Sequence, residues 1–143
     1  MQEGYRRRDS RCMLFGGGII MLPKTVCEAW KNREKAIVLT TVDQMGMPNS
    51  IYATCTDLYE ESEVVVANNY FDKTMKNIEE GTLASVLFIT TDGTSYQLKG
   101  TVSYHTQGVY YDFMKAFNPT KHPGHGAVVL HVQEAYSGSK SLH

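Results

Sequence analysis

The sequence predicts a mainly β fold, in which six antiparallel strands close into a small barrel with a few short flanking helices. Six segments of strand length are rich in β-branched and aromatic residues or alternate between apolar and polar residues. The connections between them are short, and only three segments show helical spacing. The strand–helix alternation of a doubly wound sheet is missing, as are the G-x-G-x-x-G and Walker motifs.

Length and composition fit one globular domain. The chain has 143 residues, of which 42% are hydrophobic, and this is enough for a core. Its net charge is -1, from 14 basic and 15 acidic residues, so neither a nucleic acid nor an anionic membrane is expected as a partner. No apolar run approaches transmembrane length. Cys12, Cys27 and Cys55 have no metal-binding spacing, and we therefore expect a reducing, cytoplasmic location.

The first twenty residues differ in character from the rest of the chain. Arg6–Arg8 precede an apolar segment that is interrupted by Gly16–Gly18. A secretory signal also places a basic stretch before an apolar one, but the glycines and the lack of an A-x-A cleavage site argue against it. A translated ribosome-binding site would give glycines just before a start codon, and Met21 follows them. We therefore expect residues 1–20 to be a misassigned or flexible leader, with the domain at 21–143.

The first half of the domain is expected to contain one helix and three strands. Val26, Ala29 and Trp30 recur at helical spacing. Two apolar or alternating runs follow, and Gly46 and Pro48 supply the turn between them. The expected elements are a helix at 25–33, strands at 35–42, 49–56 and 64–68, and a polar hairpin connection at 57–62.

The second half is expected to contain two helices and three strands. Gly81 ends a short helix, and Asp92–Gly93 mark a tight turn. Gly100 interrupts an alternating strand, which is typical of a bulge or a bend in a barrel. The expected elements are helices at 73–80 and 108–118, strands at 83–90, 95–105 and 127–134, a loop at 119–126 and a small, polar tail at 135–143.

Residues 63–81 are the stretch most suggestive of a binding site. An apolar strand ends at Asn68–Asn69, and Lys73 and Thr74 then begin a helix that Asp72 can cap. An ammonium, a hydroxyl and free N–H groups at the start of a helix suit a phosphate. The alternative is a solvated lysine beside an ordinary helix cap.

The histidines raise the question of a metal. His122 and His125 flank a Pro–Gly pair, and His105 and His131 lie on expected strands. A Pro–Gly loop does not fix two imidazoles, and no acid or cysteine is suitably spaced nearby. A solvated or substrate-facing loop is therefore favoured, and no metal site is expected. No convincing nucleophile–base pair is apparent either, so no catalytic side chain is predicted.

Four local patterns follow one another along the domain. They are Asp43-x-x-Gly46-x-Pro48-Asn49, Lys73-Thr74-x-x-Asn77-Ile78, Lys99-Gly100-Thr101-Val102, and Val128-Val129-Leu130-x-Val132 with Tyr136-Ser137-Gly138. In the order of these patterns, from Met21 to about Leu142, the chain resembles the pyridoxamine 5'-phosphate oxidase-like FMN-binding split-barrel family. Within that family it is most similar to the short FMN-binding proteins.

The resemblance implies a six-stranded antiparallel split β-barrel that holds FMN in a groove between the two subunits of a homodimer. It assigns the phosphate to Lys73 and Thr74, with Asn77 supporting their loop. It assigns the ribityl chain and one ring edge to Ser50, Ile51, Tyr52, Ala53 and Thr54, the ring to Val66, Ala67, Asn68 and Asn69, and the closing of the pocket to Ser95 or Gln97 of a second subunit.

Two functions remain open at this point. The first is an FMN-dependent oxidoreductase or electron carrier that acts on a small substrate, because the flavin carries the redox chemistry itself. The second is a non-catalytic binding module on the same barrel, holding haem or a deazaflavin. For haem, the candidate ligands would be His105, His122, His125 and His131.

Overall fold

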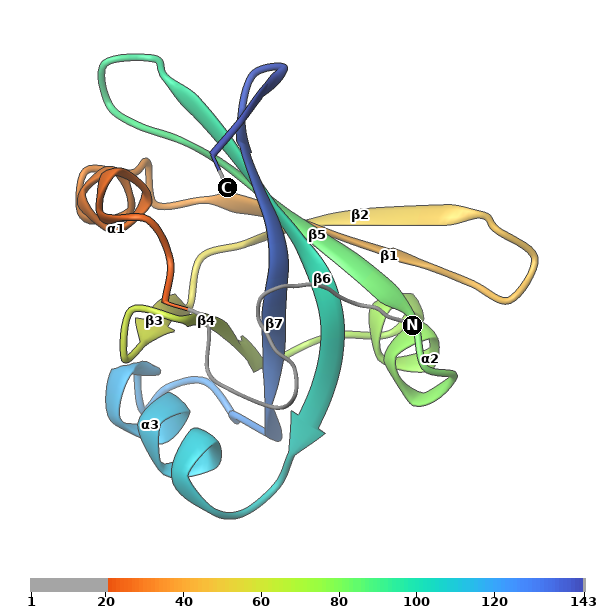
Figure 1. Cartoon of the computed structure of the whole chain (residues 1–143). Coiled ribbons are helices and arrows are strands. Elements are labelled where there is room, and N and C mark those ends of the chain that lie inside the picture. The colour runs from red at the N-terminus through yellow and green to blue at the C-terminus, as the bar shows by residue number, and fades with distance from the viewer. Residues whose placement is uncertain (1–20, 143) are drawn as a thin grey trace.

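The computed structural model describes residues 21–142, and the expected leader at 1–20 lies outside them. Three helices and eight strands follow one another in this part of the chain (Figure 1). None of these described helices combines the length and the apolar character needed to cross a membrane. The helices are α1 (Lys24–Lys31), α2 (Lys73–Glu79) and α3 (Val109–Phe117). The strands are β1 (Ile37–Val42), β2 (Pro48–Ala53), β3 (Thr56–Tyr59), β4 (Glu63–Asn68), β5 (Leu83–Ile89), β6 (Ser95–His105), β7 (Gly126–Ser137) and β8 (Lys140–Ser141).

The described strands form one antiparallel sheet in the order β2-β1-β5-β6-β7-β4-β3, with β8 paired to β7. Strands β2 and β3 are its opposite edges, yet only Thr54 and Cys55 separate them along the chain. Three Cα steps of about 3.8 Å span at most about 11 Å, so the two edges must lie close together. The sheet therefore curls into a half-barrel, with the long strands β5, β6 and β7 crossing its middle (Figure 1).

The mainly β class is confirmed, but the predicted number of six strands is wrong, because β3 and β8 are additional. Strand β3 pairs with β4 where the sequence suggested a polar connection. Glu60 and Glu61 make the turn between them, with positive φ angles of 49° and 57°. A turn of this kind usually contains Asn-Gly, and because two glutamates stand here instead, the hairpin has no signal in the sequence. The expected polar tail likewise turns back on itself, and β8 pairs with the end of β7.

Gly100 lies at the bulge that the sequence predicts. The pairing of β6 with β7 shifts register between Lys99 and Gly100. A Cβ atom at Gly100 would lie 1.9 Å from the carbonyl oxygen of His131, a distance that no side chain can adopt. The close approach of two backbones therefore requires glycine here, and it allows β6 and β7 to bend together.

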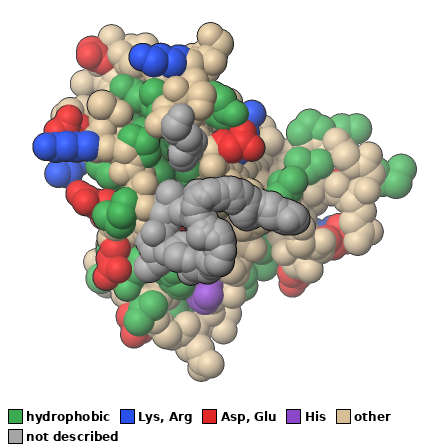
Figure 2. Space-filling view, in the orientation of Figure 1, with side chains coloured by type: hydrophobic (Ala, Val, Ile, Leu, Met, Phe, Trp, Pro, Cys, Tyr) green, Lys and Arg blue, Asp and Glu red, His purple; other side chains and the backbone are tan. Residues whose placement is uncertain are grey.

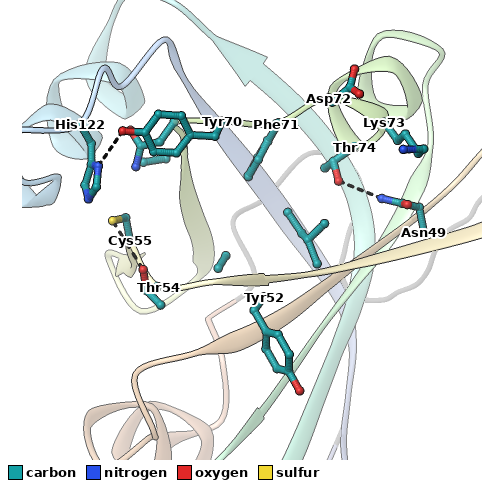
Figure 3. Close-up of a pocket in the computed structure, with 14 residues that line it drawn as sticks. Asn49, Tyr52, Thr54, Cys55, Tyr70, Phe71, Asp72, Lys73, Thr74 and His122 are labelled. Carbon is teal, nitrogen blue, oxygen red and sulfur yellow. Dashed lines mark hydrogen bonds between the residues drawn. The ribbon is translucent and has the colours of Figure 1, made fainter.

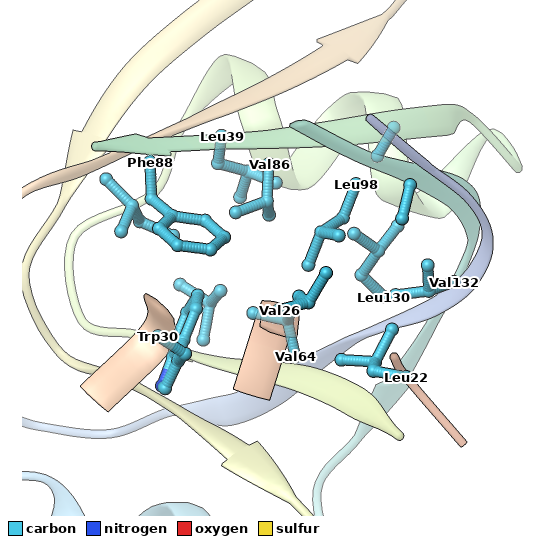
Figure 4. Close-up of a cluster of buried hydrophobic side chains, with 14 of the residues drawn as sticks. Leu22, Val26, Trp30, Leu39, Val64, Val86, Phe88, Leu98, Leu130 and Val132 are labelled. Carbon is cyan, nitrogen blue, oxygen red and sulfur yellow. The ribbon is translucent and has the colours of Figure 1, made fainter. Parts of the chain in front are cut away.

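The main core lies inside the curl of the sheet, where α1 packs against it. Val26 and Trp30 of α1 point toward Phe88 and Leu98 of the sheet (Figure 4). The ring of Trp30 meets that of Phe88 edge-on, with centroids 5.1 Å apart. The expected contact between this helix and the barrel is confirmed, and each such buried side chain contributes about 2 kcal/mol to stability.

A second apolar cluster lies on the outer face of the sheet, under α3. Alternate residues of a strand point to opposite faces, so Val64 and Val66 of β4 enter the main core while Val65 points outward. There Val65 joins Val129 of β7 and Met114 of α3, and all three are fully buried. Helix α3 thus covers β3, β4 and β7 on this side (Figure 1).

The outer side of β2, β1 and β5 is different, since no described helix covers it. Leu83, Leu87 and Ile89 of β5 are exposed there. Tyr52 is 79% exposed and lies in one row with Val38 and Leu87, through the pairs Tyr52↔Val38 and Val38↔Leu87. These five residues define what we call the uncovered face. Further hydrophobic side chains lie on the β1–β2 hairpin, at the right of Figure 2.

Helix α2 begins at Lys73 and ends before Gly81, whose φ of +81° stops it as predicted. The predicted side-chain cap is wrong, because the Asp72 carboxylate makes no capping hydrogen bond. Asp72 is instead exposed in the lining of a pocket. The tight turn at Asp92–Gly93 is confirmed by a hydrogen bond from the Gly93 N–H to the Thr90 carbonyl.

Candidate functional site

The described residues form a pocket of about 360 Å³ between β2, the end of β4 and the start of α2 (Figure 3). This volume falls within the range of about 300–1,000 Å³ usual for ligand sites. The pocket lies where the two edges of the curled sheet meet, because the β2–β3 link forms part of its wall. It is lined by Asn49, Ile51, Tyr52, Ala53, Thr54, Cys55, Ala67, Asn69, Tyr70, Phe71, Asp72, Lys73, Thr74 and His122.

One end of the pocket is polar, and the start of α2 supplies it. Lys73 is exposed and pairs with no carboxylate of the described residues. Thr74 is only 1% exposed, and its Oγ1 accepts a hydrogen bond of 3.1 Å from the Asn49 amide. Because the hydroxyl accepts here, its own proton remains available to a ligand oxygen. A fixed hydroxyl beside a free ammonium suits a phosphate or a carboxylate.

The middle of the pocket is apolar. Ile51 and Ala53 of β2, Ala67 of β4 and Phe71 of the turn before α2 line it. Figure 3 shows Tyr52 on the opposite side of β2 from Phe71. Since Tyr52 belongs both to the pocket lining and to the uncovered face, the two features adjoin each other.

The rim of the pocket joins two distant segments. The Tyr70 hydroxyl and Nδ1 of His122 are 3.0 Å apart, and their rings meet edge-on. The loop that carries His122 is held by Asn69, whose amide exchanges hydrogen bonds of 3.0 and 2.9 Å with Asn118. The Asn69 oxygen also accepts the Gly124 N–H at 2.8 Å. Asn69 therefore positions the loop beside the pocket.

The structure brings many of the predicted site residues together. They come from β2 and its link to β3, from the end of β4 and from the start of α2. The predicted residues that line the pocket are Ile51, Tyr52, Ala53, Thr54, Ala67, Asn69, Lys73 and Thr74.

Two predicted residues lie behind the pocket and shape it. The Asn68 amide donates to the Tyr104 hydroxyl at 3.0 Å, and its oxygen accepts the Phe71 N–H that begins the turn into α2. The buried amide of Asn77 donates to Thr41 at 3.0 Å and ties α2 to β1. Neither side chain lines the pocket, but both fix the elements that form its walls.

The remaining predicted residues lie elsewhere. Val66 points into the main core, and the Ser50 hydroxyl is 2.8 Å from that of Thr40. Ser95 and Gln97 were assigned to a second subunit. In this chain they stand opposite Ile89 and Leu87, so they share the side of the uncovered face.

Some pocket residues escaped the sequence reasoning. Tyr70, Phe71 and Asp72 fill the interval between the predicted Asn69 and Lys73, and their position in the chain could have revealed them. Asn49 and Cys55 flank the predicted run on β2 in the same way. His122 was expected only in a solvated or substrate-facing loop and as a candidate haem ligand, because only tertiary folding brings that loop to this pocket. Among residues 21–142, no three His, Cys, Asp or Glu side chains are arranged to hold a metal ion.

Comparison with known proteins agrees with this architecture. The profile of the pyridoxamine 5'-phosphate oxidase family matches residues 24–137, which is most of the chain. The chain therefore belongs to the pyridoxamine 5'-phosphate oxidase-like split-barrel family, and the resemblance inferred from the sequence is confirmed.

Individual relatives are distant. The uncharacterized protein MJ0282 of Methanocaldococcus jannaschii is 28% identical over 129 residues, covering 86% of this chain and 85% of that protein. HupZ of Group A Streptococcus superposes with a TM-score of 0.72 at 22% identity, covering 85% of this chain and 98% of the other. An FMN-binding protein from Syntrophomonas wolfei superposes with a TM-score of 0.64 at 20% identity, covering 81% and 88%. The two structural similarities show the fold alone.

Proposed function

We propose that this protein binds FMN in the pocket as a homodimer and serves as an oxidoreductase or electron carrier for a small substrate. One observation carries the proposal: a single pocket of ligand size combines a polar end at Lys73 and Thr74 with an apolar middle and adjoins the uncovered face. Family membership and the FMN-binding protein among the structural neighbours support it.

The residues present fit the two ends of FMN. A phosphate requires positive charge and O–H or N–H donors, which Lys73 and Thr74 supply at the start of α2. A flavin ring requires flat apolar walls, which Ile51 and Phe71 supply. FMN itself supplies hydride and electron transfer when bound, so the chain has only to bind, orient and shield it.

The uncovered face accounts for the proposed homodimer. Exposed apolar side chains in a contiguous patch mark an interaction surface. A second copy seated there would bury Tyr52 and Leu87 and would place its own Ser95 or Gln97 beside the pocket. Because Tyr52 belongs to both the pocket and this face, we expect FMN binding and dimerisation to strengthen each other.

An absorbance spectrum of the purified protein, with mass identification of the released cofactor, tests the proposal. We expect flavin bands and FMN, and we expect Lys73→Ala and Thr74→Ala each to weaken retention about tenfold or more, by loss of a charged or hydroxyl hydrogen bond. Lys76→Ala is the matched control, because Lys76 lies one turn further on, exposed and outside the pocket lining. A colourless protein that takes up no added FMN would refute the proposal.

The same spectrum distinguishes FMN binding from the second candidate function, a non-catalytic module for haem or a deazaflavin. One observation supports this second candidate: among the histidines of residues 21–142, His122 lines the pocket. A Soret band that His122→Ala abolishes would support haem. A deazaflavin would be identified by its mass after release.

A further inference from the structure

A network of five polar side chains lies outside the pocket, on the outer side of β4, β6 and β7 beside α3. Nε2 of His131 and Nε2 of His105 each lie 2.7 Å from the Ser103 hydroxyl oxygen. Nδ1 of His131 lies 2.6 Å from Oε2 of Glu63. The Tyr110 hydroxyl of α3 donates to the other carboxylate oxygen at 2.6 Å.

The Glu63 carboxylate fixes the direction of these hydrogen bonds. Burial raises the pKa of Glu63, but hydrogen bonds from His131 and Tyr110 outweigh this effect and hold the pKa below its usual value. An ionised carboxylate only accepts, so His131 carries a proton on Nδ1, and in its neutral form it presents Nε2 as an acceptor. The Ser103 hydroxyl therefore donates to His131, and Nε2–H of His105 donates to the Ser103 oxygen.

Attachment of α3 to the sheet does not explain the whole network. The bond from Tyr110 to Glu63 links α3 to β4 without further partners. His105 of β6 packs against the Tyr110 ring, with centroids 4.8 Å apart, but Ser103 only joins β6 to β7, two strands that their backbones already pair. Buried polar networks are also poor stabilisers compared with apolar side chains of similar size. The chain from Glu63 through His131 to Ser103 therefore calls for a chemical explanation.

We propose that Ser103 is a nucleophile activated by His131 and Glu63, and that small carboxylic esters are its substrates. Nucleophile, base and orienting carboxylate stand in the order that defines a Ser-His-acid triad. The side chain of His131 is 37% exposed, so the site reaches solvent. Ser103 and His105 are half-buried, so only substrates with small acyl groups can reach them.

The reaction balances without a cofactor. Oγ of Ser103 attacks the acyl carbon, and its proton moves to Nε2 of His131. The Oγ–C bond replaces the bond to the alcohol, which leaves with that proton. Water then attacks the acyl-serine by the same route, which releases the carboxylic acid and restores the hydroxyl. His105 donates from the other side of Oγ, where it can stabilise the negative charge on the carbonyl oxygen.

A fluorophosphonate probe applied to the purified full-length protein tests this proposal independently of FMN. We expect the label on Ser103, located by peptide mass spectrometry, and we expect p-nitrophenyl acetate to leave an acetyl group on the same residue. His131→Gln should slow labelling about 100-fold or more, because the base is lost. Glu63→Gln should slow it about tenfold or more, because the tautomer of His131 is no longer held.

Ser85→Ala is the matched control and should label at the wild-type rate. Ser85 is another half-buried strand serine, and it has no histidine partner among the described residues. The label is located in the wild-type chain, so the test does not depend on whether any variant folds. A folded wild-type protein without label at Ser103, or equal labelling of a folded His131→Gln variant, would overturn the proposal.

Discussion

The two outer faces of the sheet carry similar side chains but different covers. On β4 and β7, α3 packs over Val65 and Val129, and Met114 is fully buried between them. On β2 and β5, Tyr52 and Leu87 remain exposed in the chain described. The same two-residue alternation produces both faces. The comparison teaches that the alternation of residues along a strand predicts which face is apolar. It does not predict whether a helix or a second chain covers that face.

The polar groups near these two faces differ in whether they have hydrogen-bond partners within the chain. On the α3 side, Glu63, Ser103 and His131 satisfy one another within the chain. Beside the uncovered face, Lys73 has no partner among the described residues, and the Thr74 hydroxyl keeps a free proton. Donors without a partner are available to a ligand, whereas mutually bonded groups are arranged to act on one another.

The largest expected loss of stability comes from a substitution at Gly100, where β6 and β7 bend together between the covered and uncovered faces. Gly100→Ala places a Cβ against the His131 carbonyl, where β6 meets β7. Because two backbones must separate, we expect a loss of about 4 kcal/mol or more in the free energy of unfolding, measured by urea denaturation. Thr101→Ala, at an exposed neighbouring position, should change it by less than about 0.5 kcal/mol. Equal stability of the two variants would contradict this account.

The next effect compares the covered and uncovered faces directly. Met114→Ala removes a fully buried side chain and should cost about 2–4 kcal/mol. Leu87→Ala removes one that is 43% exposed, and it should cost the single chain less than about 1 kcal/mol. Denaturation at concentrations low enough to keep the chains apart measures both. A larger loss for Leu87→Ala would show that this face is already covered within one chain.

A charge on the uncovered face tests the proposed homodimer. Leu87→Glu should give a folded monomer that retains FMN poorly, because the partner surface is lost while the core is untouched. Light scattering and circular dichroism measure mass and fold. Val109→Glu on α3 is the control, since Val109 is 62% exposed on the other side and should leave the mass unchanged. A Leu87→Glu protein that is still dimeric would place the interface elsewhere.

Acid should weaken the α3 side in two steps. Burial and the charge of His131 lower the pKa of His105 despite the opposing effect of Glu63, and hydrogen bonds lower that of Glu63 despite burial. A lowered folded pKa stabilises the protein above the unfolded value and loses this effect as the pH falls. We expect the midpoint of thermal unfolding to fall first below about pH 6.5 and again below about pH 4.3. Glu63→Gln should reduce the second step, and stability that rises on acidification would contradict the scheme.

The smallest effect concerns the turn that joins β3 to β4. Glu60 and Glu61 hold positive φ angles that glycine and asparagine adopt more readily. The double substitution Glu60→Asn, Glu61→Gly should raise the free energy of unfolding by about 1 kcal/mol in the same denaturation assay. No gain would mean that the two carboxylates stabilise the turn by other contacts.

Local patterns predicted what depends on neighbours in the sequence. The bounds 95–105 of β6 match the prediction, and so do the bulge at Gly100 and the start of α2. The pocket lining on β2 and α2 was largely anticipated, because it comes from two contiguous segments that match the family. Strand β3 was missed, because its turn lacks the usual residues.

Contacts made by folding alone could not be predicted. His122 reaches the pocket only because Asn69 holds its loop. Glu63 and His131 are 68 residues apart, so their pairing leaves no local signal, and the sequence showed no nucleophile–base pair. A pattern of strands indicates which residues share a face, but the register of distant strands decides which of them touch.

The same separation of 68 residues governs how the chain can fold as it leaves the ribosome. Strands β1 and β2 can pair at once, and so can β3 and β4, but the other edge of β4 must wait for β7. Until then, the valines of β4 face water and are open to association with other nascent chains. One edge of β4 therefore stays unpaired until β7 has been made.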